Sequence, residues 1–391
     1  MPHSIDSMIE LLRQHRIGPG DRVAARLPNC QLLIDLIFAC WKIGANICPM
    51  HLRIPLPQIE PCLNRLQPKL YLSEDGICPR EALPSPIFSS IFLFTSGSTG
   101  IPKIGVLSRE NLLINAQGVV DYIGLESSDR WLLSLPLFHV GGLGILFRCF
   151  LAKAKVVLDP HDPEITHLSF VPTMLYRATP IYKQLRCLML GGAPIHKVPP
   201  KLPICLTYGL TEMSSLVTAH CNVSEENLSL GHPLPHREMK LSSQGEVLVK
   251  GACLFQGYWE NGQVERPEQN GWFPTGDLGH YSEKTGLVIT GRKDWLFISG
   301  GENIQPEEIE RALLTCPEIQ EAAVVPRPDP EFGFRPVAFV RTTVSDFSYE
   351  KMRVHLMDFL PKYKIPVALH QLEEFPRKGL KIDRQQLLKL V

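Results

Sequence analysis

Short apolar strands alternate with helix-forming segments through the first half of the chain, and this alternation restricts the fold more than any other feature. GPGDRVAARLPN (18–29) reads as a turn, a strand and a turn, and Gln31 to Ile43 then places apolar residues at helical spacing. This alternation of strand and helix predicts parallel sheets covered by helices, with ligands at the carboxyl ends of the strands. The alternation continues along the chain. The further predicted strands are Ile91 to Phe94, Trp131 to Leu137, Cys187 to Leu190 and Cys205 to Tyr208. The further predicted helices are Asn111 to Tyr122 and a long apolar helix after Leu137.

The pattern changes at about Gly231. Strands with period-two alternation, such as EVLVKG and LVITG, are now separated by Gly, Asn and Pro turns, which indicates an antiparallel, barrel-like subdomain. After GRKD (291–294) the last stretch has the size of a small α+β domain, whose first helix begins at Pro306 with acidic residues in its first turn. The prediction is therefore an α/β fold: an N-terminal domain (1–293) of layered α/β subdomains (1–230) and a barrel-like subdomain (231–293), followed by a C-terminal domain (294–391).

Composition narrows the classes of partner. The 391 residues contain 40 Lys and Arg and 40 Asp and Glu, so the chain lacks the positive field that nucleic-acid binding usually needs. The most apolar run, Leu32 to Cys48, is interrupted by Asp35, Lys42 and Gly44, so we expect neither a membrane span nor a signal peptide. The 11 cysteines show no ligand spacing, which favours reduced thiols over disulfides or zinc and a cytoplasmic protein.

The stretch FTSGSTGIPKIG, Phe94 to Gly105, has the clearest chemical character. Successive small residues let several backbone N–H groups converge on one anion, because no Cβ blocks the approach. We expect a phosphate-binding loop between a buried strand and a helix rather than a flexible linker. The spacing from Gly100 to Lys103 and the lack of a following hydroxyl exclude the G-x-x-x-x-G-K-[ST] pattern. Four hydroxyl side chains add donors: Thr95, Ser96, Ser98 and Thr99.

TSGSTGIPK resembles the signature loop of the adenylate-forming superfamily, which includes acyl- and aryl-CoA ligases, luciferases and peptide-synthetase adenylation domains. The likeness runs from about Gly20 to the C-terminus. It implies that a carboxylate attacks the α-phosphate of ATP, that pyrophosphate leaves, and that the thiol of coenzyme A displaces AMP. The other superfamily motifs follow in order: LGGAPI (190–195), YGLTE (208–212), GWFPTGD (271–277), GRKDWLFISGGENIQPEEIE (291–310) and PRKGLKIDR (376–384).

This resemblance implies roles for residues of the nucleotide site. Thr211 is expected on the α-phosphate and Glu212 on Mg²⁺, because a hard cation prefers carboxylate oxygen. Asp277 is expected to accept the ribose hydroxyls, and Arg292 to reach the ribose or a phosphate. A turn aspartate, a core tyrosine and a helix-capping glutamate are the plain structural alternatives. The remaining nucleotide-binding residues are Thr95, Ser96, Gly97, Ser98, Thr99, Gly100, Lys103, Gly191, Gly192, Ala193, Tyr208 and Gly209.

The resemblance also implies a mobile C-terminal domain that turns about a hinge at Asp294. Gly300 and Gly301 are expected to line the path of the pantetheine arm, although a hairpin turn would explain both glycines equally well. Lys381 is expected to be the catalytic lysine that bridges the attacking carboxylate and the α-phosphate. Lys378 is the alternative, because the segment PRKGLKIDR offers two lysines.

The acyl pocket is expected around PLFHVGGLGILFR (136–148). His139 lies at a strand end and Arg148 nine residues on, on one expected face of the next helix. The resemblance makes His139 a gate over the substrate, whereas Arg148 would neutralise a second carboxylate or be a surface cation. Gly209 and Ser214 complete the expected pocket. Four segments together most resemble the o-succinylbenzoate-CoA ligases of menaquinone biosynthesis: PLFHVGGLGILFR, GWFPTGDLG, FISGGENIQPEEIE and EFGFRPVA. This resemblance implies an aromatic dicarboxylate as substrate.

Three alternatives stay open at this point. They are another aryl- or acyl-CoA ligase, an adenylation enzyme that loads a carrier protein, and an inactive nucleotide-binding homologue. Fewer than a hundred residues precede the loop, so we expect a shortened first subdomain. The implied small molecules are ATP, Mg²⁺, coenzyme A and the acid, without nucleic acid or stable membrane insertion, and a homodimer is left open.

Overall fold

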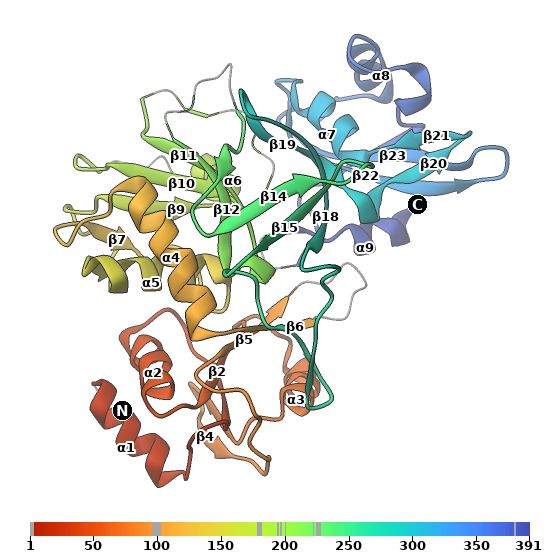
Figure 1. The fold of residues 1–391 in the computed structure, drawn as a ribbon. Helices are drawn as coiled ribbons and strands as arrows, with labels where there is room; N and C mark the ends of the chain where they lie inside the picture. The colour runs from red at the N-terminus through yellow and green to blue at the C-terminus, as the bar shows by residue number, and fades with distance from the viewer. Residues whose placement is uncertain are drawn as a thin grey trace. The chain divides into compact units, whose positions relative to one another are not determined.

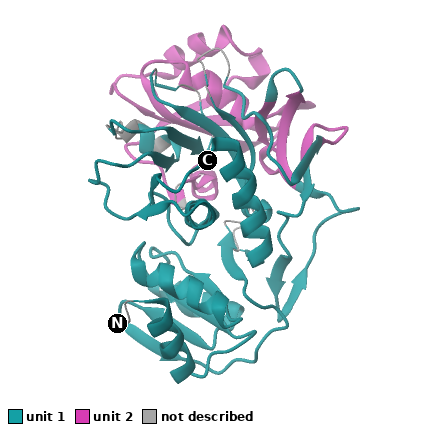
Figure 2. Ribbon diagram, turned by 60° about the vertical axis from the view of Figure 1, so that its left-hand side comes forward, with its two compact units in different colours: residues 1–240, 248–274, 283–286 teal, residues 241–247, 275–282, 287–391 magenta. Residues whose placement is uncertain are grey.

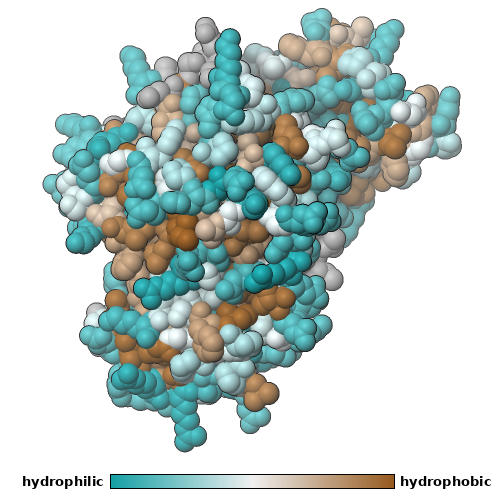
Figure 3. Space-filling view, in the orientation of Figure 1, coloured by the Kyte–Doolittle hydropathy of each residue, from teal (hydrophilic) through white to brown (hydrophobic). Residues whose placement is uncertain are grey.

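The structure is a computed structural model that describes residues 4–95, 103–177, 182–193, 195, 198–199, 201–221, 223, 228–378 and 381–391. The chain divides into two compact units, drawn in two colours in Figure 2. Unit 1 comprises residues 1–240, 248–274 and 283–286, and unit 2 comprises residues 241–247, 275–282 and 287–391. The domain boundary expected at Asp294 and the barrel-like segment 231–293 stay predictions. The face drawn in Figure 3 mixes hydrophilic and hydrophobic residues.

Unit 1 begins with an eight-stranded sheet in the order β17-β16-β6-β5-β2-β1-β3-β4 (Figure 1). Strand β1 pairs in parallel with β2 and β3, and β2 pairs in parallel with β5. The predicted strand and helix at the start of the chain are confirmed as β1 and α2. The elements are α1 (Ile5–Gln14), β1 (Arg22–Arg26), α2 (Gln31–Lys42), β2 (Asn46–Pro49), α3 (Leu56–Leu66), β3 (Leu70–Ser73), β4 (Gly76–Pro79), β5 (Ile91–Thr95), β6 (Lys103–Leu107), β16 (Gly257–Glu260) and β17 (Gln263–Glu265).

The segment after the predicted phosphate loop differs from the expectation. The chain returns as strand β6, antiparallel to β5, and Thr95 faces Lys103 across the pair. Helix α4 (Arg109–Ile123) begins only afterwards, at Ser108, whose side chain accepts from the N–H of Asn111. The expected strand–loop–helix order is therefore wrong, because alternate residues of β6 are buried against the same apolar cluster as Phe92 of β5.

A second sheet of seven strands in the order β13-β12-β11-β10-β9-β7-β8 completes unit 1. Its central strands are parallel, as predicted, whereas β12 pairs antiparallel with both β11 and β13 at one end of the sheet. Strand β7 is shorter than predicted, because the chain turns directly after Leu132, where the N–H of Ser134 donates to the Leu132 carbonyl at 2.8 Å. The elements are β7 (Arg130–Leu132), α5 (Val140–Ala152), β8 (Lys155–Val157), β9 (His167–Phe170), α6 (Pro172–Arg177), β10 (Cys187–Gly191), β11 (Ile204–Leu210), η1 (Thr211–Met213), β12 (Ser215–Cys221) and β13 (His232–Pro233).

A third sheet has four strands in the order β14-β15-β18-β19. Each of these strands contains a point where the chain passes from one unit to the other. Not every strand after Gly231 joins this sheet, since β16 and β17 extend the first sheet through β6. The bounds are β14 (Arg237–Leu241), β15 (Glu246–Gly251), β18 (Phe273–Ser282), β19 (Gly286–Arg292) and η2 (Lys293–Trp295).

The C-terminal part of unit 2 is a mixed sheet in the order β21-β20-β23-β22, with β24 beside β23, and a hairpin of β25 and β26. The helix predicted to begin at Pro306 is confirmed, and its apolar face packs on Phe347, Met352 and Leu356. The elements are β20 (Phe297–Ser299), β21 (Glu302–Ile304), α7 (Pro306–Leu314), β22 (Ile319–Asp329), β23 (Gly333–Thr342), α8 (Tyr349–Met357), η3 (Lys362–Lys364), β24 (Ala368–Gln371), β25 (Arg377–Lys378), β26 (Lys381–Ile382), α9 (Arg384–Leu387) and η4 (Leu388–Leu390).

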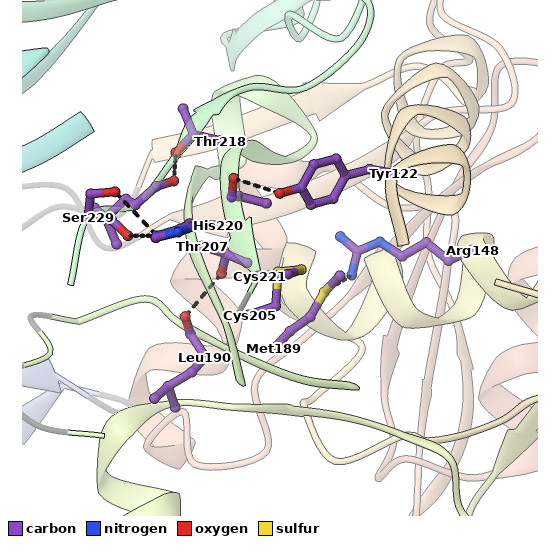
Figure 4. Close-up of a disulfide and its surroundings, with 12 residues drawn as sticks. Tyr122, Arg148, Met189, Leu190, Cys205, Thr207, Thr218, His220, Cys221 and Ser229 are labelled. Atoms are coloured by element: carbon purple, nitrogen blue, oxygen red, sulfur yellow. Dashed lines mark hydrogen bonds between the residues drawn. A yellow bond between two sulfur atoms is a disulfide. The ribbon is translucent and has the colours of Figure 1, made fainter. Parts of the chain in front are cut away.

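The prediction that all cysteines are reduced is wrong for one pair. Cys205 of β11 and Cys221 of β12 face each other across the antiparallel pair and form a disulfide (Figure 4). The other nine cysteines are free. Sequence spacing could not reveal this pair, because the two residues become neighbours only through the register of the strands. No helix in the part of the chain that the structure describes has the length and hydropathy needed to span a bilayer.

Candidate active site

The carboxyl ends of β10 and β11 bring the LGGAPI and YGLTE motifs together. The two strands are parallel neighbours, and Gly191 pairs with Thr207. A Cβ on Gly191 would lie 2.3 Å from the Thr207 hydroxyl oxygen, and a Cβ on Gly209 would lie 2.3 Å from the Ser215 carbonyl oxygen. Both positions therefore require glycine because another backbone passes so closely. Gly192, Ala193 and Gly209 are exposed at this edge, whereas Tyr208 is buried.

The turn after β11 carries Thr211 and Glu212. Two hydrogen bonds hold Glu212: its carbonyl accepts from the N–H of Phe255 at 2.7 Å, and its carboxylate Oε1 accepts from the Tyr258 hydroxyl at 2.6 Å. Phe255 lies just before β16, and Tyr258 lies within it. Glu212 thus has a fixed backbone and one fixed carboxylate oxygen.

The ends of the predicted phosphate loop lie beside this turn. Strand β6 runs past Thr211, since a Cβ on Gly105 would be 3.6 Å from the Thr211 methyl group. The ammonium of Lys103 lies 4.7 Å from the centre of the Tyr258 ring. Thr95 donates its hydroxyl to the Lys103 carbonyl at 3.3 Å. The other predicted loop residues, Ser96, Gly97, Ser98, Thr99 and Gly100, lie outside the described residues.

The donor set at Glu212 suits a magnesium ion that is also bound by a nucleotide. Mg²⁺ in such sites takes one or two carboxylates together with phosphate oxygens and water. Among the residues that the structure describes, none donates a hydrogen bond to Oε2 of Glu212, so one carboxylate oxygen is left for a cation. The neighbouring Lys103 and Thr211 carry a positive charge and a hydroxyl group beside this turn.

Arg148 is buried within unit 1, so the alternative of a surface cation is wrong. Its side chain leaves α5 toward the second sheet (Figure 4), donates to the Ser215 hydroxyl at 2.9 Å and contacts the Met189 sulfur at 3.6 Å. Its Nε has no hydrogen-bond partner among the described residues, and none of their carboxylates pairs with it. Burial, and then the positive charge of Arg237, lower the pKa of Arg148 to about 9.

Gly144 makes room for this guanidinium. A Cβ at that position would lie 2.8 Å from Nη2 of Arg148 and 2.9 Å from the hydroxyl oxygen of Ser215. Ser214, the residue expected in the pocket, instead donates its hydroxyl to the Cys253 carbonyl at 2.9 Å. The hydroxyl that Arg148 contacts is therefore that of Ser215.

His139 is the N-cap residue of α5 and belongs to a different cluster from Arg148. Its ring lies 4.7 Å from that of Phe138 and 6.0 Å from that of His51, measured between ring centres. His139 was expected at the end of a strand, but β7 ends at Leu132 and His139 instead directly precedes α5, which begins at Val140. Burial, with a smaller effect of Arg53, lowers the pKa of His51.

In unit 2, the structure brings Asp277, Arg292 and Asp294 together. Arg292 donates to Asp277 at 3.0 Å, to Asp294 at 2.7 Å and to the carbonyl of Thr275 at 2.8 Å. Burial acts to lower the pKa of Arg292, but the two carboxylates outweigh it and the pKa is raised. Asp277 and Arg292, predicted from separate motifs, thus form one ion pair.

The remaining predicted residues of unit 2 are exposed. Gly300 and Gly301 have positive φ values of 58° and 86°, and Gly300 donates its N–H to the Phe332 carbonyl at 2.9 Å. Lys381 lies in β26, opposite Lys378 of β25, with its side chain exposed. Glycine is favoured at both positive-φ positions.

Sequence reasoning missed three side chains of these clusters. Tyr258 bonds to Glu212, Ser215 bonds to Arg148, and the Trp131 ring lies 5.5 Å from the guanidinium carbon of Arg148. Ser215 directly follows the predicted Ser214 and is the first residue of β12. Tyr258 lies 46 residues from Glu212, and no local pattern links the two.

Two family models match this chain. The AMP-binding enzyme model matches residues 3–90 and 79–259, and the AMP-binding enzyme C-terminal domain model matches residues 308–380. The chain belongs to the AMP-binding enzyme family, as the resemblance implied.

Within this family, the chain is similar to 2-succinylbenzoate–CoA ligases. The chain is 35% identical over 424 residues to the 2-succinylbenzoate–CoA ligase of Escherichia coli (strain K12), covering 98% of this chain and 90% of that protein. The o-succinylbenzoate CoA synthetase MenE from Bacillus subtilis in complex with the acyl-adenylate intermediate OSB-AMP superposes with a TM-score of 0.86 at 27% identity, covering 98% and 91% of the two chains. The same enzyme in complex with ATP and magnesium gives a TM-score of 0.85 at 28% identity, covering 98% and 92%.

Proposed function

We propose that this protein is an AMP-forming acid–thiol ligase that activates o-succinylbenzoate with ATP and transfers the acyl group to coenzyme A, giving 2-succinylbenzoyl-CoA for menaquinone biosynthesis. The similarity to 2-succinylbenzoate–CoA ligases supports this reaction. The observation in this chain that carries the choice of acid is Arg148, a buried cation without a carboxylate partner among the described residues. A dicarboxylic acid supplies that partner and keeps a second carboxylate for the chemistry.

The residues of unit 1 prepare the anionic reactants for each other. Magnesium, when bound, neutralises charge on the phosphates and is held by the carboxylate of Glu212. Lys103 and the loop before it bind phosphate oxygens, Thr211 donates to the α-phosphate, and Gly191 to Ala193 with Tyr208 form the adenine surface. Because the carboxylate and the triphosphate repel each other, fixed donors of this kind are what lower the barrier.

The residues of unit 2 complete the proposed reaction. Asp277 accepts the ribose hydroxyls and Arg292 holds Asp277 in place, as their 3.0 Å contact supports. The ammonium of Lys381 bridges the attacking carboxylate and the α-phosphate, and Asp294 is the hinge between the two half-reactions. Coenzyme A passes Gly300 and Gly301, where the exposed backbone leaves room for a thin chain.

A panel of acids tests the proposal. The protein is incubated with ATP, Mg²⁺, coenzyme A and o-succinylbenzoate, benzoate or a medium-chain fatty acid, and pyrophosphate release is followed. We expect o-succinylbenzoate to exceed the others more than tenfold in kcat/KM, which requires about 1.4 kcal/mol of discrimination. Equal turnover of benzoate would contradict the proposed acid. Pyrophosphate release without acyl-CoA would favour the carrier-loading alternative, and no release with any acid would favour the inactive homologue.

We also infer a cytoplasmic location and keep a homodimer as a prediction. The location is supported by the nine free cysteines, which are typical of reducing compartments, although the Cys205–Cys221 disulfide does not follow this rule. Fractionation of cells tests the location, and light scattering of the purified protein tests the homodimer.

A further inference from the structure

Tyr258 connects two charged groups of the proposed nucleotide site. Its hydroxyl donates to Oε1 of Glu212 at 2.6 Å, and the ammonium of Lys103 lies 4.7 Å from its ring centre. The phenol ring therefore lies between the residue at the end of the phosphate loop and the carboxylate proposed to bind magnesium.

The backbone around Tyr258 fixes this position. Tyr258 pairs with Gly105 of β6, two residues from Lys103, so the two side chains lie on the same face of neighbouring strands. Gly257 has a φ of 134°, and a Cβ there would lie 2.3 Å from the Glu265 carbonyl oxygen. The ring also contacts Phe255 edge to face at 4.9 Å between ring centres.

The hydrogen bond has a directional consequence. A hydroxyl that donates to a carboxylate makes a short, charge-assisted bond and restricts rotation of the carboxylate. With Oε1 engaged and the main chain of Glu212 held by Phe255, the remaining oxygen keeps one orientation. Lys103 over the ring face adds a cation–π contact that holds the ring in place.

We propose that Tyr258 is a positioning residue for the divalent cation: its hydroxyl holds one carboxylate oxygen of Glu212 so that the other faces the magnesium of bound MgATP. The inference rests on the proposed function. Its expected effect is on the magnesium requirement, whereas recognition of the acid by Arg148 is left unchanged.

The test compares Tyr258→Phe with the unmodified protein, using the full chain. The phenylalanine ring keeps the contacts with Phe255 and Lys103 and removes only the hydroxyl. ATP binding is measured by calorimetry without acid while Mg²⁺ is varied, and the KM for o-succinylbenzoate is measured at saturating Mg²⁺. We expect the half-saturating Mg²⁺ concentration to rise about tenfold and the KM for the acid to change less than twofold. Tyr182→Phe is the matched control, because the Tyr182 hydroxyl donates at 2.7 Å to the Pro160 carbonyl elsewhere in unit 1.

A double-mutant cycle with Glu212→Ala separates positioning from general stability. Tyr258→Phe is expected to have no further effect on Mg²⁺ dependence once the carboxylate is absent. An unchanged magnesium requirement in Tyr258→Phe, or an equal effect with and without Glu212, would overturn the proposal. Failure of the unmodified protein to bind ATP at any Mg²⁺ concentration would instead contradict the proposed function. If the phenylalanine variant is not recovered folded, Tyr258→Met takes its place in the same cycle.

Discussion

Replacing Arg148 with methionine is expected to stabilise the protein without ligand and to abolish selection of the dicarboxylate. Arg148→Met keeps a long, unbranched side chain in the same space and removes the charge. Arg148 is 2% exposed, and the described partners of its guanidinium are one hydroxyl, one thioether and the face of Trp131. None of these groups carries a negative charge, so the charge is buried without compensation.

The magnitude follows from these contacts. Replacing buried ionic groups by apolar ones of similar volume is often neutral or stabilising by about 1 to 4 kcal/mol. Leaving the Ser215 hydroxyl without its partner costs about 1 to 3 kcal/mol and offsets part of this gain. Taking the midpoints of these two ranges, about 2.5 and about 2 kcal/mol, we expect a net gain of about 0.5 kcal/mol, or a rise in Tm of about 1 to 2 °C if a kcal/mol shifts Tm by roughly 2 to 4 °C.

The pH dependence has a definite sign. Because the pKa of Arg148 is lowered to about 9 in the folded protein, the cost of burying its charge is fully present below pH 9. Above pH 9 the folded protein releases that proton while the unfolded chain keeps it. The free energy of unfolding of the unmodified protein therefore rises relative to that of the variant. The Tm difference between the two proteins should shrink as the pH rises from 8 through 9.

Two assays check the reasoning together. Thermal unfolding is followed with and without o-succinylbenzoate, and kcat/KM is measured for o-succinylbenzoate and benzoate. We expect the dicarboxylate to raise the Tm of the unmodified protein only, and the variant to lose about 100-fold in kcat/KM for o-succinylbenzoate, with benzoate little affected. A Tm lowered by several degrees together with unchanged selectivity would refute the argument, since it would make Arg148 a structural residue.

Three further predictions concern other parts of the chain. Gly144→Ala, whose Cβ would lie 2.8 Å from the buried guanidinium, should raise the KM for the dicarboxylate several-fold without changing the KM for ATP; Gly18→Ala, which has no atom within 4 Å, is the matched control. Lys381→Ala should lose adenylate formation, measured by pyrophosphate exchange, while ATP binding by calorimetry survives; an unimpaired variant would move the role to Lys378. A thiol reagent should detect nine thiols in the unfolded, unreduced protein and eleven after reduction, and eleven in both would exclude the Cys205–Cys221 disulfide.

The alternating pattern of the sequence predicted five strands of the first two sheets, β1, β5, β7, β10 and β11, because burial sets that pattern directly. Parallel strands covered on both faces read as short apolar runs, and β1, β10 and β11 are buried in this way. The helix at Pro306 was predictable because proline at the first helical position and acidic residues in the first turn act locally. In the candidate site, the motifs placed Gly191, Thr211 and Glu212 at strand ends, where the structure has them.

Contacts between distant segments could not be predicted in the same way. Strand β6 contains apolar and β-branched residues that suit a strand, yet nothing in KIGVL indicates that it pairs with β5 before the helix begins. The disulfide depends on the register of β11 and β12, and the bond from Tyr258 to Glu212 depends on β16 joining the first sheet. These contacts require the tertiary arrangement, which local propensity does not encode.

A comparison of two buried arginines shows why Arg148, and not its neighbour in the same unit, is suited to a ligand. Arg237 donates to three backbone carbonyls, those of Pro235, Leu216 and Asn115, so the protein itself satisfies its guanidinium. Arg148 has a single hydroxyl acceptor and a weak sulfur contact, and its Nε has no partner among the described residues. A buried donor without an acceptor costs free energy, and a carboxylate that binds beside it supplies the missing acceptor and removes that cost. The difference in acceptors, rather than burial or charge alone, therefore separates the arginine that supports the fold from the one that we propose selects the substrate.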